Sequence, residues 1–277
     1  MAVRVERLAR IVLNSADPKA LARFFIDACG FSRRAGVERR SQVLRLGPTR
    51  LDIIHAVGRP YPAEVQGWSP LFQHCALVTT DMTRAMAGLH KIHGWTTIST
   101  SGPEHLPESS GGVAAFKFRD PEGHPLEFLA FPAAPADDSD ELFLRIDHSA
   151  ISVTSTERSV AFYARLGLRV GARSLNVGPE QARLDAVPNA EVEVTALDLP
   201  TGAKPHVELL CYRGTYDRDV GPVQPDDVAA TRLVFAVESI EAMNAIRTAH
   251  ADRLIPTEGA GALLRDPDGH IVEIEVC

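Results

Sequence analysis

A tight turn followed by a strand occurs twice in this sequence, once in each half of the chain. The two copies are residues 119–127 (RDPEGHPLE) and residues 265–273 (RDPDGHIVE). Proline fixes φ at the second position of the turn, and glycine supplies the positive φ that the turn needs. In the strand that follows, side chains alternate between faces, so Leu126 and Phe128 face one way and Glu127 the other. A carboxylate on the inner face of an apolar strand is costly unless it is paired or binds a metal, so Glu127 indicates a site.

Length, charge and cysteine usage limit the classes of protein that fit. A chain of 277 residues is typical of about two domains. Its net charge of −7 argues against a nucleic-acid binder and favours a small-molecule substrate or a protein partner. The four cysteines show neither CxxC nor disulfide-framework spacing, which is typical of a reducing compartment. Because the sequence has no signal-peptide pattern and no apolar run of roughly 20 residues, we expect a cytoplasmic protein without membrane contact.

The order strand, helix, several strands is predicted four times along the chain. The four units are residues 1–57, 72–132, 145–213 and 230–277. Residues 133–144, rich in proline, alanine and aspartate, are the best candidate for a linker. The sequence therefore predicts an N-terminal domain, 1–132, and a C-terminal domain, 145–277, each with two units. One unit alone would leave a sheet face uncovered, so the units must pair.

The starts of the predicted helices carry capping residues. Asp17 followed by Pro18 is an N-cap with proline at the first helical position. Thr154 and Glu157 form a capping-box pattern. The other two helices are expected to begin near Thr80 or Asp81 and near Ser239.

This pattern resembles the vicinal oxygen chelate superfamily, which includes glyoxalases, extradiol dioxygenases and bleomycin-resistance-type binding proteins. The matching segments are the strand starts at His74 (HCALV) and His148 (HSAISV), the paired aromatic residues within two helices, and the two DPxGHxxE segments. The resemblance implies an α+β fold of four βαβββ modules, paired into two open, curved, barrel-like sheets with the helices outside. One fold of this kind hosts many reactions, so the resemblance specifies the fold better than the chemistry.

In the superfamily each module offers two ligand positions, one on its first strand and one on its last. Aligned by hand, the four modules offer Arg10 and Asp52, His74 and Glu127, His148 and Glu208, and Arg232 and Glu273. If modules one and two pair, and three and four pair, as implied by extradiol dioxygenases, each barrel holds one arginine, one histidine and two acids. If modules two and three pair, as implied by tandem glyoxalases, both histidines share one barrel.

Electrostatics favours the pairing of modules two and three. Arginine is charged at every relevant pH and repels a divalent cation in a partly desolvated cavity. Two imidazoles and two carboxylates instead suit a divalent metal ion such as Zn, Ni, Co, Mn or Fe. The predicted metal ligands are His74, Glu127, His148 and Glu208. The remaining set would form salt bridges and need no metal.

Three functions remain open at this point. The first is a metal-dependent lyase or isomerase that stabilises an enediolate-like charge on a small oxygenated substrate by Lewis-acid action. Glu127 or Glu208 would then be the catalytic base that shuttles a proton. The second is a ring-cleaving extradiol-type dioxygenase, which usually uses two histidines and one carboxylate on iron. The third is a metal-free binding protein of the drug-resistance type, with Trp68, Trp95 and the 99–112 loop lining its pocket. The chain could act as a monomer or a homodimer.

Several polar residues are expected to lie outside the site. His124 and His270 lie within the two turns and are expected at the surface. His206 is placed near the end of a strand and is not counted as a ligand. Arg183, in the segment 178–184 where middle strands line the pocket in the superfamily, is expected to be exposed, although it could contact an anionic substrate.

Overall fold

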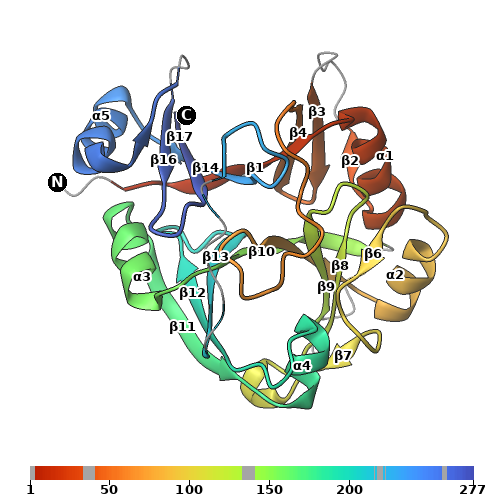
Figure 1. Cartoon of the computed structure of the whole chain (residues 1–277). Helices are drawn as coiled ribbons and strands as arrows, with labels where there is room; N and C mark the ends of the chain where they lie inside the picture. The colour runs from red at the N-terminus through yellow and green to blue at the C-terminus, as the bar shows by residue number, and fades with distance from the viewer. Residues whose placement is uncertain are drawn as a thin grey trace.

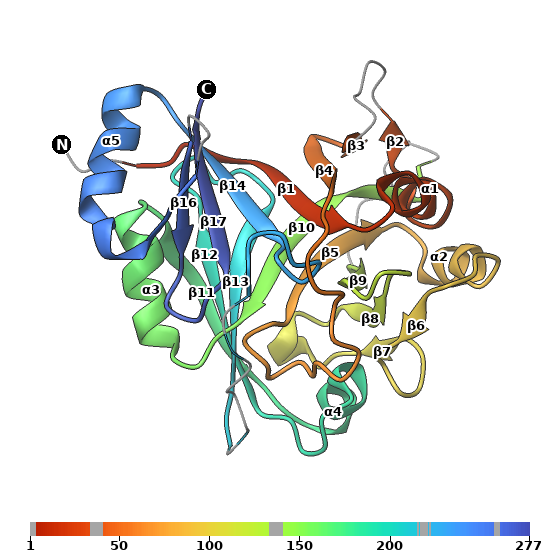
Figure 2. The same cartoon turned by 45° about the horizontal axis from the view of Figure 1, so that its top comes forward.

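Two curved, unclosed sheets form the centre of this protein, as a computed structural model shows (Figures 1 and 2). The structure describes residues 4–33, 41–132, 141–214, 216, 221, 223–257 and 261–277. The first sheet has eight strands in the order β15-β16-β17-β14-β1-β4-β3-β2. The second has nine, in the order β11-β12-β13-β10-β5-β9-β8-β6, with β7 paired to β8 outside this path. The α+β fold and the open, curved sheets are as predicted.

Each module begins with a long strand and a helix and continues with shorter strands. Module one comprises β1 (Arg7–Ser15), α1 (Pro18–Cys29), β2 (Ser32–Arg33), β3 (Ser41–Leu46) and β4 (Thr49–His55). Module two comprises β5 (Gln73–Thr79), α2 (Met82–Leu89), β6 (Thr96–Thr97), β7 (Glu104–His105), a 3-10 turn (Glu108–Ser110), β8 (Ala114–Arg119) and β9 (Pro125–Ala130). Module three comprises β10 (Phe143–Ser152), α3 (Thr156–Arg165), β11 (Arg169–Asn176), α4 (Pro179–Asp185), β12 (Val192–Asp198) and β13 (His206–Tyr212). Module four comprises β14 (Arg232–Val237), α5 (Ile240–Ala249), a 3-10 turn (Ala251–Arg253), β15 (Leu254–Ile255), β16 (Ala262–Arg265) and β17 (Ile271–Val276).

The first strands of the modules join them in pairs. β5 pairs antiparallel with β10, so modules two and three share the nine-stranded sheet. β1 pairs antiparallel with β14, so modules one and four share the eight-stranded sheet. The pairing that electrostatics favoured is therefore confirmed. The division at 133–144 stays a prediction, and its residues 133–140 lie outside the described residues.

The strand register is the same in all four modules. In each module, the acid on the last strand pairs with a residue of the first strand. That first-strand residue lies two positions after the predicted ligand position of the same strand. These partners are Val12 and Asp52, Ala76 and Glu127, Ala150 and Glu208, and Val234 and Glu273. The hand alignment from the sequence, including the choice of Arg232, agrees with this register.

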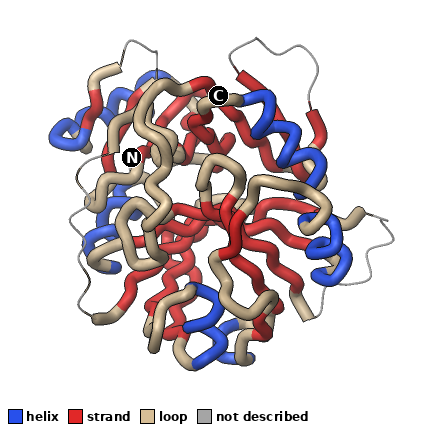
Figure 3. The backbone as a smooth tube through the Cα atoms, turned by 45° about the vertical axis from the view of Figure 1, so that its right-hand side comes forward, coloured by secondary structure: helices blue, strands red, loops and turns tan. Residues whose placement is uncertain are grey.

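Helices α1, α2, α3 and α5 lie outside the sheets (Figure 3) and begin at side-chain caps, whereas α4 begins without one. Asp17, Asp81 and Ser239 cap α1, α2 and α5, as predicted. The capping box expected at Thr154 is wrong by one residue, because the hydroxyl of Ser155 accepts from the backbone N–H of Arg158. The Thr154 hydroxyl instead contacts Asp268, in the turn of module four. None of the described helices is long and apolar enough to cross a membrane.

The two DPxGH turns connect the sheets. In the first, Asp120 accepts from the backbone N–H of His124 at 3.0 Å and contacts its ring Nδ1 at 2.8 Å. His124 Nε2 lies 3.0 Å from the carbonyl oxygen of Asn14, in module one, and 3.2 Å from that of Val228, in the segment before module four. Burial lowers the pKa of His124, but the adjacent Asp120 carboxylate outweighs it and raises the pKa. His124 thus joins module two to module one and to the segment that leads into module four.

The second turn makes a similar but smaller contact. His270 Nε2 lies 2.9 Å from the carbonyl oxygen of Ser152, at the end of β10. His124 and His270 are only 1% and 7% exposed. The prediction that they lie at the surface is therefore wrong, because each turn folds back against strand ends of other modules.

Candidate metal centre

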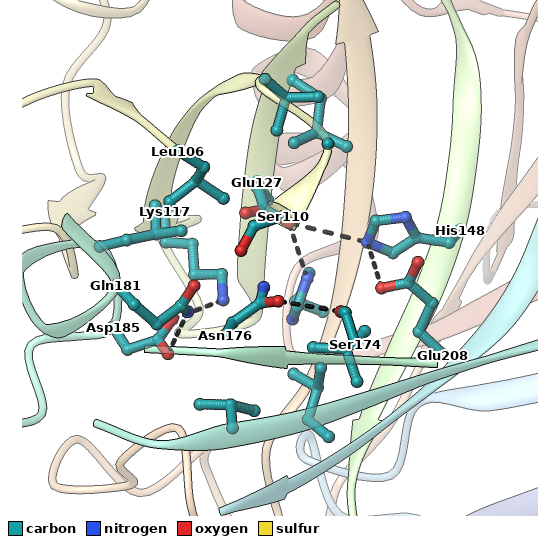
Figure 4. Close-up of a pocket in the computed structure, with 18 of the residues that line it drawn as sticks. Leu106, Ser110, Lys117, Glu127, His148, Ser174, Asn176, Gln181, Asp185 and Glu208 are labelled. Carbon is teal, nitrogen blue, oxygen red and sulfur yellow. Dashed lines mark hydrogen bonds and ion pairs between the residues drawn. The ribbon is translucent and has the colours of Figure 1, made fainter. Parts of the chain in front are cut away.

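A cavity of about 200 Å³ lies within the curve of the nine-stranded sheet (Figure 4). Its walls come from both modules of that sheet, and α4 and the loop around Ser110 also line it. The four predicted ligand residues face it: His74 on β5, Glu127 on β9, His148 on β10 and Glu208 on β13. All four come from strands that are adjacent in the sheet, which explains why residues far apart in sequence meet.

Three of these residues form a compact group. His74 Nε2 lies 3.0 Å from Glu127 Oε2, and His148 Nε2 lies 3.7 Å from the same oxygen. One donor atom from each of the three residues lies within 4.8 Å of the others, a spacing at which they could share a metal ion. All three residues are buried. Two imidazoles and a carboxylate are donors that transition metals prefer.

Glu208 lies beside this group and is shared with a third histidine. Its Oε2 is 3.6 Å from His148 Nε2, and its Oε1 is 3.1 Å from His206 Nε2. Behind His148, the carboxylate of Asp147 lies 3.3 Å from the ring Nδ1. A carboxylate in this position orients a metal-binding imidazole and raises its basicity.

The electrostatics of the group favour a cation. Burial lowers the pKa of His148, but the charge of Glu208, with Asp147 and Glu127, outweighs it and raises the pKa to about 10. Burial alone would raise the pKa of Glu127, but the neighbouring Lys117 and the two histidines hold it well below its usual range. By contrast, burial dominates at His74 and lowers its pKa. The carboxylates therefore create a field that holds a proton on His148, and the same field favours a divalent ion.

A second polar cluster lines the same cavity. Lys117 on β8 is 4% exposed, and its Nζ lies 2.6 Å from Asp185 Oδ1 at the end of α4. The other oxygen of Asp185 accepts from Gln181 Nε2 at 2.7 Å and from the Tyr212 hydroxyl at 2.9 Å. Burial lowers the pKa of Lys117, but Asp185 and Glu127 outweigh it and raise the pKa, so the ammonium stays charged.

Comparison with solved structures extends this description to the fold as a whole. Glyoxalase I from Zea mays matches 97% of this chain and 92% of its own, with a TM-score of 0.64 at 16% identity. A mutant of that enzyme gives a TM-score of 0.67 at 17% identity, with the same coverage. The chain has the vicinal oxygen chelate fold. A putative dioxygenase from Bacillus subtilis subsp. subtilis str. 168 matches 99% of this chain and 86% of its own, with a TM-score of 0.58 at 11% identity. No protein-family model matches the sequence, and neither does any curated protein.

The equivalent positions in the other sheet of this vicinal oxygen chelate fold are ion-paired. Arg10 Nε lies 3.2 Å from Asp52, and its terminal nitrogens contact Glu273 at 3.3 Å and also Glu275. Arg232 lies 3.8 Å from Glu273. The prediction that these groups form salt bridges is confirmed.

Sequence reasoning missed two residues, one that contacts a cavity residue and one that lines the cavity. His206 was set aside because of its place on β13, yet it contacts Glu208. Lys117 was not considered, although Phe116 and Phe118 on either side are buried against the opposite face of the sheet. Strand alternation alone would have placed Lys117 on the same face as Glu127, its partner on β9.

The segments expected to line the pocket do so only in part. The segment 178–184 falls on a helix, α4, rather than on a middle strand. Arg183 forms a bidentate pair with Glu104 at 2.8 and 2.9 Å and does not line the cavity. Trp68 stacks on Tyr216, and Trp95 packs against Phe116 and Phe118, so neither tryptophan lines the cavity. The loop 99–112 does contribute, through Leu106, Ser110 and Gly111.

Proposed function

We propose that this protein is a metal-dependent enzyme, a lyase or isomerase, that acts on a small substrate with adjacent oxygen atoms. The observation that carries the proposal is the convergence of His74, Glu127 and His148, with Glu208 beside them, on one buried cavity. The similarity of fold to glyoxalase I over nearly the whole chain supports the same reading.

The donor set fits a divalent metal. His74 Nδ1 is buried and has no hydrogen-bond partner among the described residues, while its Nε2 is directed at Glu127. His148 has the carboxylate of Asp147 behind it, and its own Nε2 faces Glu127 and Glu208. Two neutral imidazoles and two carboxylates would balance the charge of such an ion.

Each carboxylate has a distinct chemical role in this proposal. A bound divalent metal would act as a Lewis acid toward the oxygen atoms of the substrate. Glu208, which faces the cavity and contacts His148 and His206, takes a proton from the carbon next to those oxygens and returns it to a neighbouring atom. Glu127, in contact with both His74 and His148, fixes the orientation of the two imidazoles and can serve as the base in place of Glu208.

The test combines metal analysis with proton exchange. Purified protein should contain about one equivalent of a transition metal by elemental analysis. In deuterated water, the metal-loaded protein should exchange the carbon-bound protons of an α-hydroxyketone such as dihydroxyacetone, as measured by NMR. Glu208→Gln should slow this exchange by about 100-fold or more while metal is partly retained, because general base catalysis has this size. Glu273→Gln, the equivalent change in the other sheet, is the control. Unchanged exchange in both Glu127→Gln and Glu208→Gln rejects the proton-transfer role.

A dioxygenase is the second candidate, and one observation favours it. The compact group consists of two histidines and one carboxylate, the donor set of many non-haem iron oxygenases, while Glu208 leans toward His206. If this reading holds, protein loaded with ferrous iron should consume oxygen in the presence of a catechol. Oxygen uptake without proton exchange would favour the dioxygenase, and the reverse would favour the lyase or isomerase.

A further inference from the structure

The charged side chain of Lys117 faces the cavity from the strand next to the candidate metal ligands. We infer that Lys117 binds a carboxylate of the substrate, so that the cavity selects small hydroxy or oxo acids with a carboxylate beyond the metal-binding oxygens. This inference rests on the proposed function, because it concerns the substrate class of the same cavity.

The ammonium group has unused hydrogen-bond donors. An ammonium carries three N–H donors, and among the described residues the only hydrogen-bond acceptor of Lys117 is Asp185. The second oxygen of Asp185 accepts from Gln181 and Tyr212, so Asp185 is itself fixed in position. Asp185 therefore holds Lys117 in place and leaves two donors for a ligand.

A second polar atom in this cluster also lacks a partner. Gln181 is 4% exposed and lines the cavity, and its Oε1 has no hydrogen-bond partner among the described residues. A buried amide oxygen without a partner costs free energy unless a ligand or water supplies a donor. The cluster thus offers both a cationic group and an acceptor to one small polar molecule.

The position of Lys117 places an anion beside the donor set. Lys117 and Glu127 are directly paired on neighbouring antiparallel strands, β8 and β9. The β-carbons of such a pair lie about 4.5–5.5 Å apart, so both side chains enter the cavity side by side. Figure 4 shows Lys117 and Asp185 on one side of the cavity, with His148 and Glu208 on the other. A substrate that spans the cavity can reach both.

Charge balance does not oppose an anion here. A divalent metal and Lys117 together offset the charges of Glu127, Glu208 and Asp185. Asp147 is offset separately, by Arg145 at 3.3 Å and Lys204 at 3.8 Å. A purely structural role explains the lysine less well, because a buried ion pair is often no more stabilising than apolar residues of similar size.

The size of the cavity limits the substrate to a few carbon atoms. Its volume of about 200 Å³ is below the roughly 300–1,000 Å³ of pockets that hold drug-sized ligands. A four-carbon hydroxy dicarboxylate is a molecule of suitable size, with a chelating end for the metal and a carboxylate for Lys117.

The experiment compares two ligands that differ only in charge at the far end. The ligands are malate and the monoamide in which the carboxylate far from the hydroxyl is replaced by an uncharged carboxamide, each as both enantiomers. Binding to metal-loaded protein is measured by calorimetry. We expect one enantiomer of malate to bind about tenfold more tightly than its amide, the size of a hydrogen bond to a charged group. In Lys117→Met the ratio of the malate affinity to the amide affinity should fall to about one, with the affinity of the amide retained. Lys91→Met, which removes an exposed lysine, should leave the ratio unchanged.

A second variant protects the test against misfolding. Lys117→Met leaves Asp185 buried without its cation, so Lys117→Met combined with Asp185→Asn removes both charges together. This double variant should fold and also show a ratio of about one. A wild-type ratio near one, no measurable binding of malate, or a ratio retained in the double variant each overturns the inference. A lysine with only a structural role would lower the melting temperature and leave the ratio unchanged.

The same titration in metal-free protein separates this inference from the proposed function. If the protein binds no metal yet prefers malate in a Lys117-dependent manner, the metal proposal fails and the inference stands. If metal binds and both ligands bind equally, the inference fails and the metal proposal stands.

Discussion

The two sheets of this molecule place four side chains at equivalent positions but with opposite chemistry. The nine-stranded sheet has His74, Glu127, His148 and Glu208 there, and the eight-stranded sheet has Arg10, Asp52, Arg232 and Glu273. The acids occur in both sheets, so the difference lies in the first-strand residues. In the eight-stranded sheet, the guanidinium groups of the arginine side chains supply the positive charge. In the other, neutralisation of the carboxylates is left to a proton, a metal ion or a ligand.

A second difference is the helix α4, which is inserted between β11 and β12 of module three. Its last residue, Asp185, contacts Lys117 of module two, and the backbone oxygen of Leu184 accepts from the Ser99 hydroxyl at 3.0 Å. Among the described residues, no helix follows the equivalent strands β2, β6 and β15. The helix joins modules two and three across the cavity. This insertion and the two histidines therefore distinguish the nine-stranded sheet, which has the candidate site, from the ion-paired eight-stranded sheet.

The largest expected effect is on metal binding. His148→Ala should reduce metal affinity by more than about 100-fold, because even partners outside the ligand shell contribute about 10–100-fold. Arg232→Ala changes a first-strand residue of the other sheet and should leave one bound equivalent. Metal content after dialysis, measured by elemental analysis, checks both. Equal metal content in the two variants would mean that the sheets do not differ in the proposed way.

The pH dependence of stability should also distinguish the metal-free from the metal-loaded protein. Because the pKa of His148 is raised, its contribution to stability is complete below the unfolded value near 6.5 and is lost as pH rises through about 10. The metal-free protein should therefore lose up to about 5 kcal/mol of unfolding free energy between these pH values. Glu127 and Glu208 have lowered pKa values, so their contribution is lost only in acid. Denaturant titrations across this range measure the slope.

Metal loading should cancel that slope. A metal displaces the proton from His148, so metal affinity should rise by up to about tenfold per pH unit over the same range. His148→Ala is the control, because it should remove the His148-dependent part of both slopes. Above pH 7, the stability of the metal-free wild-type protein should fall more steeply than that of His148→Ala. If it does not, the charge assigned to His148 is wrong.

A change of similar size is expected in the ion-paired sheet. Arg10→Met leaves Asp52, Glu273 and Glu275 without a shared cation, and loss of one partner from a largely buried ion pair costs about 3 kcal/mol. His74→Met in metal-free protein removes a neutral imidazole and should cost about 1 kcal/mol. Denaturant unfolding measures both values. Equal losses of unfolding free energy in Arg10→Met and His74→Met would mean that the Arg10 guanidinium does not take the place that a metal ion has in the nine-stranded sheet.

The sequence predicts the parts of this molecule that depend on local rules. Strand alternation places Glu127 and Glu208 inward, and turn chemistry identifies both DPxGH segments. The four units followed from repetition, their open, curved sheets from the family resemblance, and the pairing of modules two and three from the charge of arginine. These features depend on the residue types within one module and on one electrostatic comparison between modules.

The contacts that the sequence could not supply all join distant modules. Asp185 meets Lys117 only because α4 crosses to another module, and nothing near either residue in sequence indicates the partner. His206 was excluded from its position on one strand, whereas its role depends on the neighbouring strand β10. The two turn histidines were misplaced for the same reason, since a turn in isolation is exposed and becomes buried only against another module's strand.

The smallest expected effect compares these two turn histidines. His124 Nε2 lies near two backbone carbonyl oxygens, and its ring is held by Asp120, whereas His270 Nε2 lies near one carbonyl oxygen. In the second turn, Asp266 accepts from the Tyr163 hydroxyl at 3.3 Å. A hydrogen bond contributes about 0.5–1.5 kcal/mol, so the additional contacts of His124 should make His124→Ala cost roughly 1 kcal/mol more than His270→Ala. Denaturant unfolding measures this difference. Equal costs would mean that His124 owes its contribution to filling space rather than to its contacts with Asp120 and the second carbonyl oxygen.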